Sequence, residues 1–363
     1  MTDAVDFKPR DSRPGLSYPF TAPPAPGDTL EVAPGVRWIR MPLPFLLDHI
    51  NLWAIDDGDH GWALVDTGIR NQTTIDHWRK LFANAPDQRS ISRVFVTHMH
   101  PDHVGMAGWL TRKFGCRLWI TRLEYLVCRM LVSDTGREAP DEAIAFYRAA
   151  GWGEDAIETY RARFGDFGNH IYCLPDSHRR LRDGEEIRIG AHDWRVIVGH
   201  GHSPEHACLY CPALKVLISG DQVLPRISSN VSVYPTEPDA NPMADWLESL
   251  DKLEREVPDD VLVLPAHNEC FRGLHARLRQ LRDGQAETLD RLRAALSRPC
   301  RATDVFGALF ARSIDGAPAD TMLLGMATGE SLACLNYLMA RGEVVRSRDD
   351  DGVDWYRLGK GDS

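Results

Sequence analysis

The chain lacks the features typical of membrane and secreted proteins. No stretch of its 363 residues approaches the roughly 20 consecutive apolar residues that a membrane helix needs. Its first ten residues contain no apolar core of a secretory signal. We therefore expect a protein that does not contact a membrane, with the cytoplasm as its location.

Cysteine and net positive charge are also scarce. Eight cysteines in a chain of this length are too few for a dense disulfide framework. Cys208 and Cys211 have a metal-binding spacing, but on a strand their side chains would face opposite ways, so we expect buried, reduced thiols. A formal net charge of −10 argues against nucleic acid as a partner, because an acidic surface repels phosphate.

What the sequence does contain is a set of metal-ligand residues at the ends of short apolar runs. A strand-like run at 93–96 is followed by His98, His100, Asp102 and His103, and a helical pattern begins there. The four side chains therefore lie on a strand-to-helix loop. Such a loop lies at the carboxyl edge of a sheet, where α/β proteins build their sites.

Four further strand-like runs each deliver one residue of the same kind. These residues are Asp66, His202, Asp221 and His267. If the strands lie side by side, their ends converge on one point. A single histidine usually has a structural role and binds no metal. We expect the same of the histidines outside these motifs, including His49.

The donor types and their number indicate the metal. Imidazoles and carboxylates without thiolates suit zinc, iron or manganese, and zinc fits best. The candidates are too many for one tetrahedral ion, whereas two divalent ions about 3.5–4 Å apart would share a bridging carboxylate. We therefore expect two divalent metal ions, most simply Zn²⁺, with iron or manganese as alternatives.

These motifs resemble those of the metallo-β-lactamase superfamily, in its dinuclear, glyoxalase-II-like branch. The resemblance implies an α/β fold, a four-layer αβ/βα sandwich. It implies that one ion is held by His98, His100 and His202. The other would be held by Asp102, His103 and His267, with Asp221 bridging the two. Asp66 and His206 would orient ligands without binding metal.

Departures from sister branches narrow the chemistry. Antibiotic-hydrolysing members place a cysteine where this chain has Asp221, and flavodiiron members place a glutamate at His100. Persulfide dioxygenases have similar motifs, and the ligand types alone do not exclude that activity. We expect a hydroxide bridging the metals to attack the acyl carbon of a small-molecule thioester, or of a related ester or lactone. Asp102 would be catalytic, orienting that hydroxide and accepting a proton.

Two alternatives come from other functional classes. One is an endoribonuclease-type phosphodiester hydrolase of the same superfamily, which the acidic charge disfavours. The other is a non-enzymatic, metal-sensing regulator.

The loop after Asp221 offers three candidate substrate-binding residues, Arg226, Asn230 and Tyr234. Arg226 suits a carboxylate or phosphate, with a surface ion pair as the alternative. Tyr234 suits donation to an oxyanion.

Composition divides the chain into three parts. We expect a Pro-rich extended arm over residues 1–31, a hydrolase domain over 32–284 and a winged-helix domain over 285–363. A helical insertion over about 117–178 either lines the pocket or decorates the scaffold. In the last part, Thr328 is expected to cap a helix, and a hairpin is expected to turn at Asp351-Gly352. This part has few basic residues, so we expect it to pack on the core or on a second subunit in a homodimer.

Overall fold

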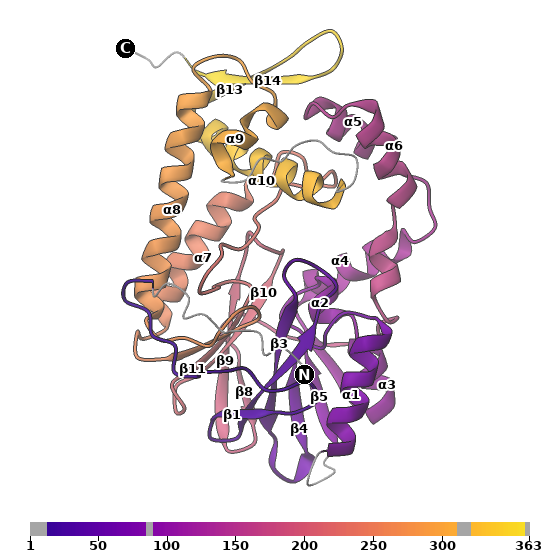
Figure 1. The fold of residues 1–363 in the computed structure, drawn as a ribbon, viewed down its shortest axis with the longest axis vertical. Coiled ribbons are helices and arrows are strands. Elements are labelled where there is room, and N and C mark those ends of the chain that lie inside the picture. The colour runs from indigo at the N-terminus through magenta and orange to yellow at the C-terminus, as the bar shows by residue number, and fades with distance from the viewer. Residues whose placement is uncertain (1–12, 85–89, 311–320, 360–363) are drawn as a thin grey trace, which may run out of the picture.

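The computed structural model describes residues 13–84, 90–310 and 321–359, which form two β-sheets packed face to face with helices on both outer surfaces (Figure 1). This is the four-layer αβ/βα sandwich expected from the sequence. Each sheet buries one face against the other sheet and one face under helices, so most strands are apolar on both faces.

The first sheet has the order β1-β2-β3-β4-β5-β6-β7, antiparallel from β1 to β4 and parallel from β4 to β7. Its strands are β1 (Leu30–Ala33), β2 (Val36–Pro42), β3 (His49–Asp56), β4 (Trp62–Val65), β5 (Ile91–Phe95), β6 (Arg117–Ile120) and β7 (Arg179–Arg180).

The second sheet has the order β12-β11-β10-β9-β8, with β11 and β12 parallel and the other pairs antiparallel. Its strands are β8 (Glu186–Ile189), β9 (His192–Gly199), β10 (His206–Cys211), β11 (Val216–Gly220) and β12 (Leu262–Pro265). Cys208 and Cys211 are both buried and lie on opposite faces of β10, and all eight cysteines are free.

Three apolar clusters hold the layers together. The cluster between the sheets includes Trp38 and Trp53 from the first sheet and Trp194 from the second. The outer face of the first sheet packs under α1 (Gln72–Asn84), α3 (Ala107–Phe114) and α4 (Arg122–Ser133), and the short helix α2 (Pro101–Val104) precedes α3. Gly115 ends α3 in a left-handed conformation, as the sequence indicated.

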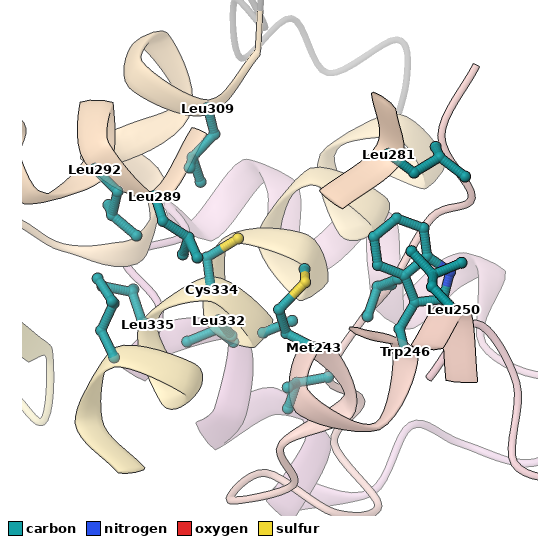
Figure 2. Close-up of a cluster of buried hydrophobic side chains, with 14 of the residues drawn as sticks. Met243, Trp246, Leu250, Leu281, Leu289, Leu292, Leu309, Leu332, Cys334 and Leu335 are labelled. Atoms are coloured by element: carbon teal, nitrogen blue, oxygen red, sulfur yellow. The ribbon is translucent and has the colours of Figure 1, made fainter. Parts of the chain in front are cut away.

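The third cluster covers the outer face of the second sheet and includes the C-terminal helices (Figure 2). Its helices are α7 (Pro242–Glu256), α8 (Leu274–Ala295), α9 (Phe306–Leu309) and α10 (Thr321–Ala340). Trp246 and Leu250 of α7, Leu292 of α8 and Leu335 of α10 all belong to it. The C-terminal part therefore shares one continuous core with the second sheet.

The C-terminal part ends in the expected hairpin, β13 (Val344–Arg348) paired with β14 (Asp354–Leu358). The expected cap at Thr328 is wrong, because α10 already begins at Thr321 and Thr328 lies inside it. The Thr328 hydroxyl instead donates to the carbonyl oxygen of Leu324 at 2.8 Å and accepts from Nε1 of Trp152 at 2.8 Å.

The segment between β6 and β7 is mostly helical and consists of α4, α5 (Asp141–Ala149), α6 (Glu154–Arg163) and the 3₁₀ turn η2 (Asp166–His170). Its aromatic side chains pack on one another: Tyr147 lies 4.2 Å from Trp152 and 4.7 Å from Tyr160 between ring centroids. They join the same apolar cluster as α10, so α5 and α6 rest against the C-terminal part.

Residues 13–29 of the expected arm pack against the same chain. Ser17 forms an antiparallel bridge with Arg272, and Phe20 contacts Trp38 edge-on at 6.3 Å. Residues 1–12 lie outside the described part. Among the described residues, no helix combines the length and apolarity needed to cross a bilayer.

Candidate metal centre

The strand ends of both sheets meet at one edge of the sandwich. β5 leads to His98, β9 to His202, β11 to Asp221 and β12 to His267. The seven expected ligands lie there in two groups, and within each group the ligand atoms are all within 4.8 Å of one another. These groups are His98, His100, His202 and Asp221, and Asp102, His103 and His267.

The first group is held by close contacts between imidazole nitrogens. Nε2 of His98 lies 2.9 Å from Nδ1 of His100 and 3.2 Å from Nε2 of His202. Burial and the neighbouring imidazoles lower the pKa of His98, and burial lowers the pKa of His100 to about 3. Both rings are therefore neutral at physiological pH, which is the form that binds a metal.

Asp221 connects the two groups. Its Oδ2 lies 3.4 Å from Nε2 of His202, in the first group. Its Oδ1 lies 3.5 Å from Nε2 of His103 and 3.4 Å from Nε2 of His267, in the second group. One carboxylate thus presents one oxygen to each set of donors.

Asp102 completes the second group. Its Oδ2 lies 3.6 Å from Nε2 of His103 and 3.4 Å from Nε2 of His267. Burial alone would raise the pKa of Asp102, but His103 and His267 outweigh burial and lower it to about 2. Burial likewise opposes protonation of His267, while Asp221 and Asp102 raise its pKa to about 10. The imidazoles of His103 and His267 therefore face the carboxylates of Asp102 and Asp221. A metal cation would lie between these groups.

Two buried polar atoms support the view that this site fits a metal ion. Nε2 of His103 and Oδ1 of Asp221 have no hydrogen-bond partner in the described part of the chain. A buried polar atom without a partner is costly, typically by about 1–3 kcal/mol. Both atoms point at the shared centre, and the donor set of nitrogen and carboxylate oxygen suits zinc, iron or manganese.

Three ligand imidazoles are oriented by a hydrogen bond at the opposite side of the ring. Nδ1 of His103 lies 2.8 Å from Oδ2 of Asp66. Nδ1 of His202 lies 2.7 Å from the carbonyl oxygen of Asn230, and Nδ1 of His267 lies 2.8 Å from that of His49. In each case Nδ1 donates, so Nε2 is the nitrogen directed at the centre.

Asp66 also fixes the loop that carries the first histidines. It accepts hydrogen bonds from the backbone N–H and the hydroxyl of Thr97, each at 2.8 Å. Asp66 adopts a left-handed backbone conformation with φ of 63°, and so does Asn268, next to His267, with φ of 67°. Such strain in non-glycine residues gathers where the surrounding structure holds a functional geometry.

Glu124 of α4 is a supporting residue that sequence reasoning missed. It is fully buried and accepts three hydrogen bonds, from the N–H of Met99 at 2.8 Å, the hydroxyl of Ser203 at 2.7 Å and the N–H of Glu205 at 2.7 Å. One carboxylate thus ties the loop of His98 and His100 to the loop of His202. Burial raises the pKa of Glu124.

His206 and the candidate substrate residues lie around this centre. Nε2 of His206 accepts from the backbone N–H of Asp221 at 3.1 Å. Arg226 donates from Nε to Glu269 at 2.7 Å and lies over the ring of Tyr18, and a role for Arg226 toward substrate stays a prediction. The side chain of Asn230 donates to Glu330, and its backbone carbonyl holds His202.

Tyr234 is 46% exposed as a residue. Burial of its hydroxyl nonetheless raises the pKa of that group, while Ser232 opposes the change. A role for Tyr234 toward substrate stays a prediction.

Comparison with known families covers most of the chain. The model described as "Metallo-beta-lactamase superfamily" matches residues 46–267, and that described as "Metallo-beta-lactamase-like, C-terminal domain" matches residues 289–359.

Solved structures and a curated relative agree with this match. A β-lactamase domain protein from Burkholderia ambifaria is 42% identical, with a TM-score of 0.85 over 95% of this chain and 98% of its own. A metallo-β-lactamase family protein from Thermus thermophilus is 25% identical, with a TM-score of 0.74 over 91% of this chain and all of its own. An acyl-coenzyme A thioesterase from Gallus gallus is 24% identical over 65% of this chain and 79% of its own length.

Proposed function

The chain belongs to the metallo-β-lactamase superfamily, and from this premise we propose that it is a two-metal hydrolase of thioesters or of related esters and lactones. The observation that carries the proposal is Asp221, which directs one oxygen toward each of two groups of donors. A site of this kind, without thiolates, fits two divalent ions, Zn²⁺ first and iron or manganese as alternatives.

Two divalent ions in such a site would lower the pKa of water toward about 7 and polarise an acyl carbonyl oxygen. The residues of the chain then have two supporting tasks. Asp66, Asn230 and His49 keep each ligand imidazole in the tautomer that presents Nε2. Glu124 holds the loop of His98 and His100 against the loop of His202.

Asp102 is the group placed to handle a proton. Its Oδ2 faces His103 and His267, and its low pKa keeps it ionised at neutral pH. An ionised carboxylate at this position would orient the attacking water and accept the proton that the water gives up as its oxygen bonds to the acyl carbon. The reaction needs no serine or cysteine nucleophile, and Ser203 donates its hydroxyl to Glu124 instead.

The proposed bond type rests on two supports. A thioesterase is among the curated relatives, although at 24% identity. The residue at the expected bridging position is Asp221, where antibiotic-hydrolysing members of the superfamily typically carry a cysteine. A thiolate leaving group also needs no protonation at neutral pH, so acyl transfer to water requires only one placed proton acceptor.

The test is a metal analysis followed by a substrate panel. Purified protein is expected to contain about two equivalents of divalent metal and, in a panel of thioesters, lactones and phosphodiesters, to hydrolyse thioesters or lactones but not phosphodiesters. Asp221→Ala should lose most of the metal and the hydrolysis, whereas Asp59→Ala, which removes an exposed carboxylate between β3 and β4, should keep both.

Two results would overturn the proposal. Equal turnover by Asp221→Ala would exclude the bridging role. Cleavage of single-stranded RNA alone, without any ester turnover, would favour the endoribonuclease alternative.

A further inference from the structure

A second feature of the molecule is a groove lined by arginines at the β7 edge of the first sheet, which we call the arginine groove. Its main hollow has a volume of about 600 Å³, within the range of small-molecule sites. It is lined by Arg117, His178, Arg179, Arg180, Arg182 and Glu185.

The positive charge of this groove is largely uncompensated. Arg179 pairs with Glu185 and lies over the ring of Trp119. Within the described ranges, the guanidinium groups of Arg117, Arg180 and Arg182 make no hydrogen bond or ion pair. Nε of Arg180 is buried and has no partner there.

Guanidinium groups held this close together repel one another, and a bound anion would relieve that repulsion. Arg122 adds a further cation nearby, since both it and Arg180 lower the pKa of His178 after burial does. The nearby acidic groups are already engaged. Asp183 binds Lys252 and the N–H of Val198, and Glu205 binds the N–H of Leu123.

The groove continues to the loop that carries the candidate metal ligand His202. A second hollow of about 220 Å³ shares Arg180 and Arg182 with the first and is also lined by Thr121, Asp183, His200 and Glu205. His200 and Glu205 flank His202, and the Thr121 hydroxyl donates to the carbonyl oxygen of Glu205 at 2.8 Å. The arginines therefore lie along the outer side of the loop that presents a candidate metal ligand.

We propose that the arginine groove binds the phosphate groups of a nucleotide-bearing leaving group, of the kind that coenzyme A provides. This inference rests on the proposed thioesterase function. Guanidinium groups bind phosphate oxygens in pairs, and several of them suit a ligand with more than one phosphate. An extended thiol with a distant phosphorylated nucleotide would place its sulfur at the metals and its phosphates among the arginines.

Binding is tested on the full-length protein with adenosine 3′,5′-bisphosphate, by calorimetry. We expect saturable binding that weakens with salt and falls about tenfold or more in Arg182→Ala, and further in Arg180→Ala/Arg182→Ala. Arg357→Ala is the matched control, because Arg357 is exposed on β14, and it should bind normally. Arg182 is exposed, so its single variant should fold even if the double variant does not.

Kinetics separate this inference from the proposed function. The arginine variants should raise the KM for an acyl-coenzyme A about tenfold with kcat unchanged, and should leave hydrolysis of the matching acyl-N-acetylcysteamine, which lacks phosphate, as in the wild type. Equal effects on both thioesters, or bisphosphate binding that survives the substitutions, would overturn the groove's role while leaving the hydrolase intact.

A single-stranded RNA oligonucleotide that binds the groove more tightly than the bisphosphate would also overturn it. If neither thioesters nor related esters and lactones are hydrolysed, the proposed function fails, and the calorimetry still decides whether the groove binds phosphates.

Discussion

The side-chain amide of Asn230 donates a hydrogen bond to Oε2 of Glu330 at 3.0 Å. The backbone carbonyl of the same Asn230 holds Nδ1 of His202 at 2.7 Å. A residue of helix α10 is therefore two contacts away from a candidate metal ligand. Burial raises the pKa of Glu330 to about 7, against the opposing effect of Asn230.

Glu330→Gln should change how stability depends on pH. Because the pKa of Glu330 in the folded protein lies above its ordinary value of 4.5, the folded state holds the proton more tightly than the unfolded chain. Its contribution to the free energy of unfolding is thus fully present below about pH 4.5 and is lost as the pH rises to about 7. Relative to the variant, the wild type should lose up to about 3 kcal/mol over this interval.

Urea unfolding at about pH 5 and about pH 8, with a chelator present, measures this difference. Glu158→Gln, on the exposed side of α6, is the control and should show none. A pH-independent difference between wild type and Glu330→Gln would mean that the proton is not held in the folded state.

Asp66→Asn should weaken metal binding by the group of Asp102, His103 and His267. The amide cannot accept from Thr97 and His103 as the carboxylate does, so the His103 ring loses the anion that fixes its tautomer. We expect metal affinity to fall roughly 10–100-fold, measured by competition with a chromogenic chelator. Asp59→Asn provides the matched control, and a wild-type titration curve for Asp66→Asn would contradict the orienting role.

Glu124→Ala should destabilise the protein without touching a ligand. The substitution leaves the N–H groups of Met99 and Glu205 buried without their acceptor. Each such group costs about 1–3 kcal/mol, and Glu124→Gln, which retains one acceptor oxygen, should cost less. Thermal melts in a chelator isolate this effect from metal binding. Equal melting temperatures for the two variants would show that hydrogen bonding is not the cause.

Metal should stabilise the folded protein. Binding to preorganised ligands raises the free energy of unfolding by about 2.7 kcal/mol when free metal is at about 100 times its Kd. We expect a higher melting temperature on adding Zn²⁺ to chelator-treated protein. Asp221→Ala should show a much smaller rise, and an identical rise would place the metal elsewhere.

The sequence predicted the arrangement of the candidate ligands because their signal is local. His98, His100, Asp102 and His103 lie within six residues, directly after an apolar run that β5 confirms. The strand that precedes Asp221 and the one that precedes His267 gave the same signal. When the ends of several strands lie at one edge of the sandwich, the residues that follow them come together. This does not depend on the structure of the segments that connect the strands.

The residues that hold the candidate ligands in place could not be predicted from a local sequence pattern. Glu124 lies inside an amphipathic helix, 25 residues from the Met99 amide that it accepts from. Asn230 and His49 act through backbone carbonyls, which every residue possesses, so no side-chain pattern identifies them. The cap expected at Thr328 failed for a related reason, since a threonine inside a helix can bond back to a carbonyl four residues earlier.

The apolar cluster that joins the second sheet to α8 and α10 also limits how the molecule can be divided. A chain cut near residue 284 would lose Leu292 of α8 and Leu335 of α10, which belong to the same cluster as Trp246 of α7, and it should expose apolar surface and precipitate. Because the hydrolase part is completed by residues from the far end of the chain, the two parts should melt in a single transition.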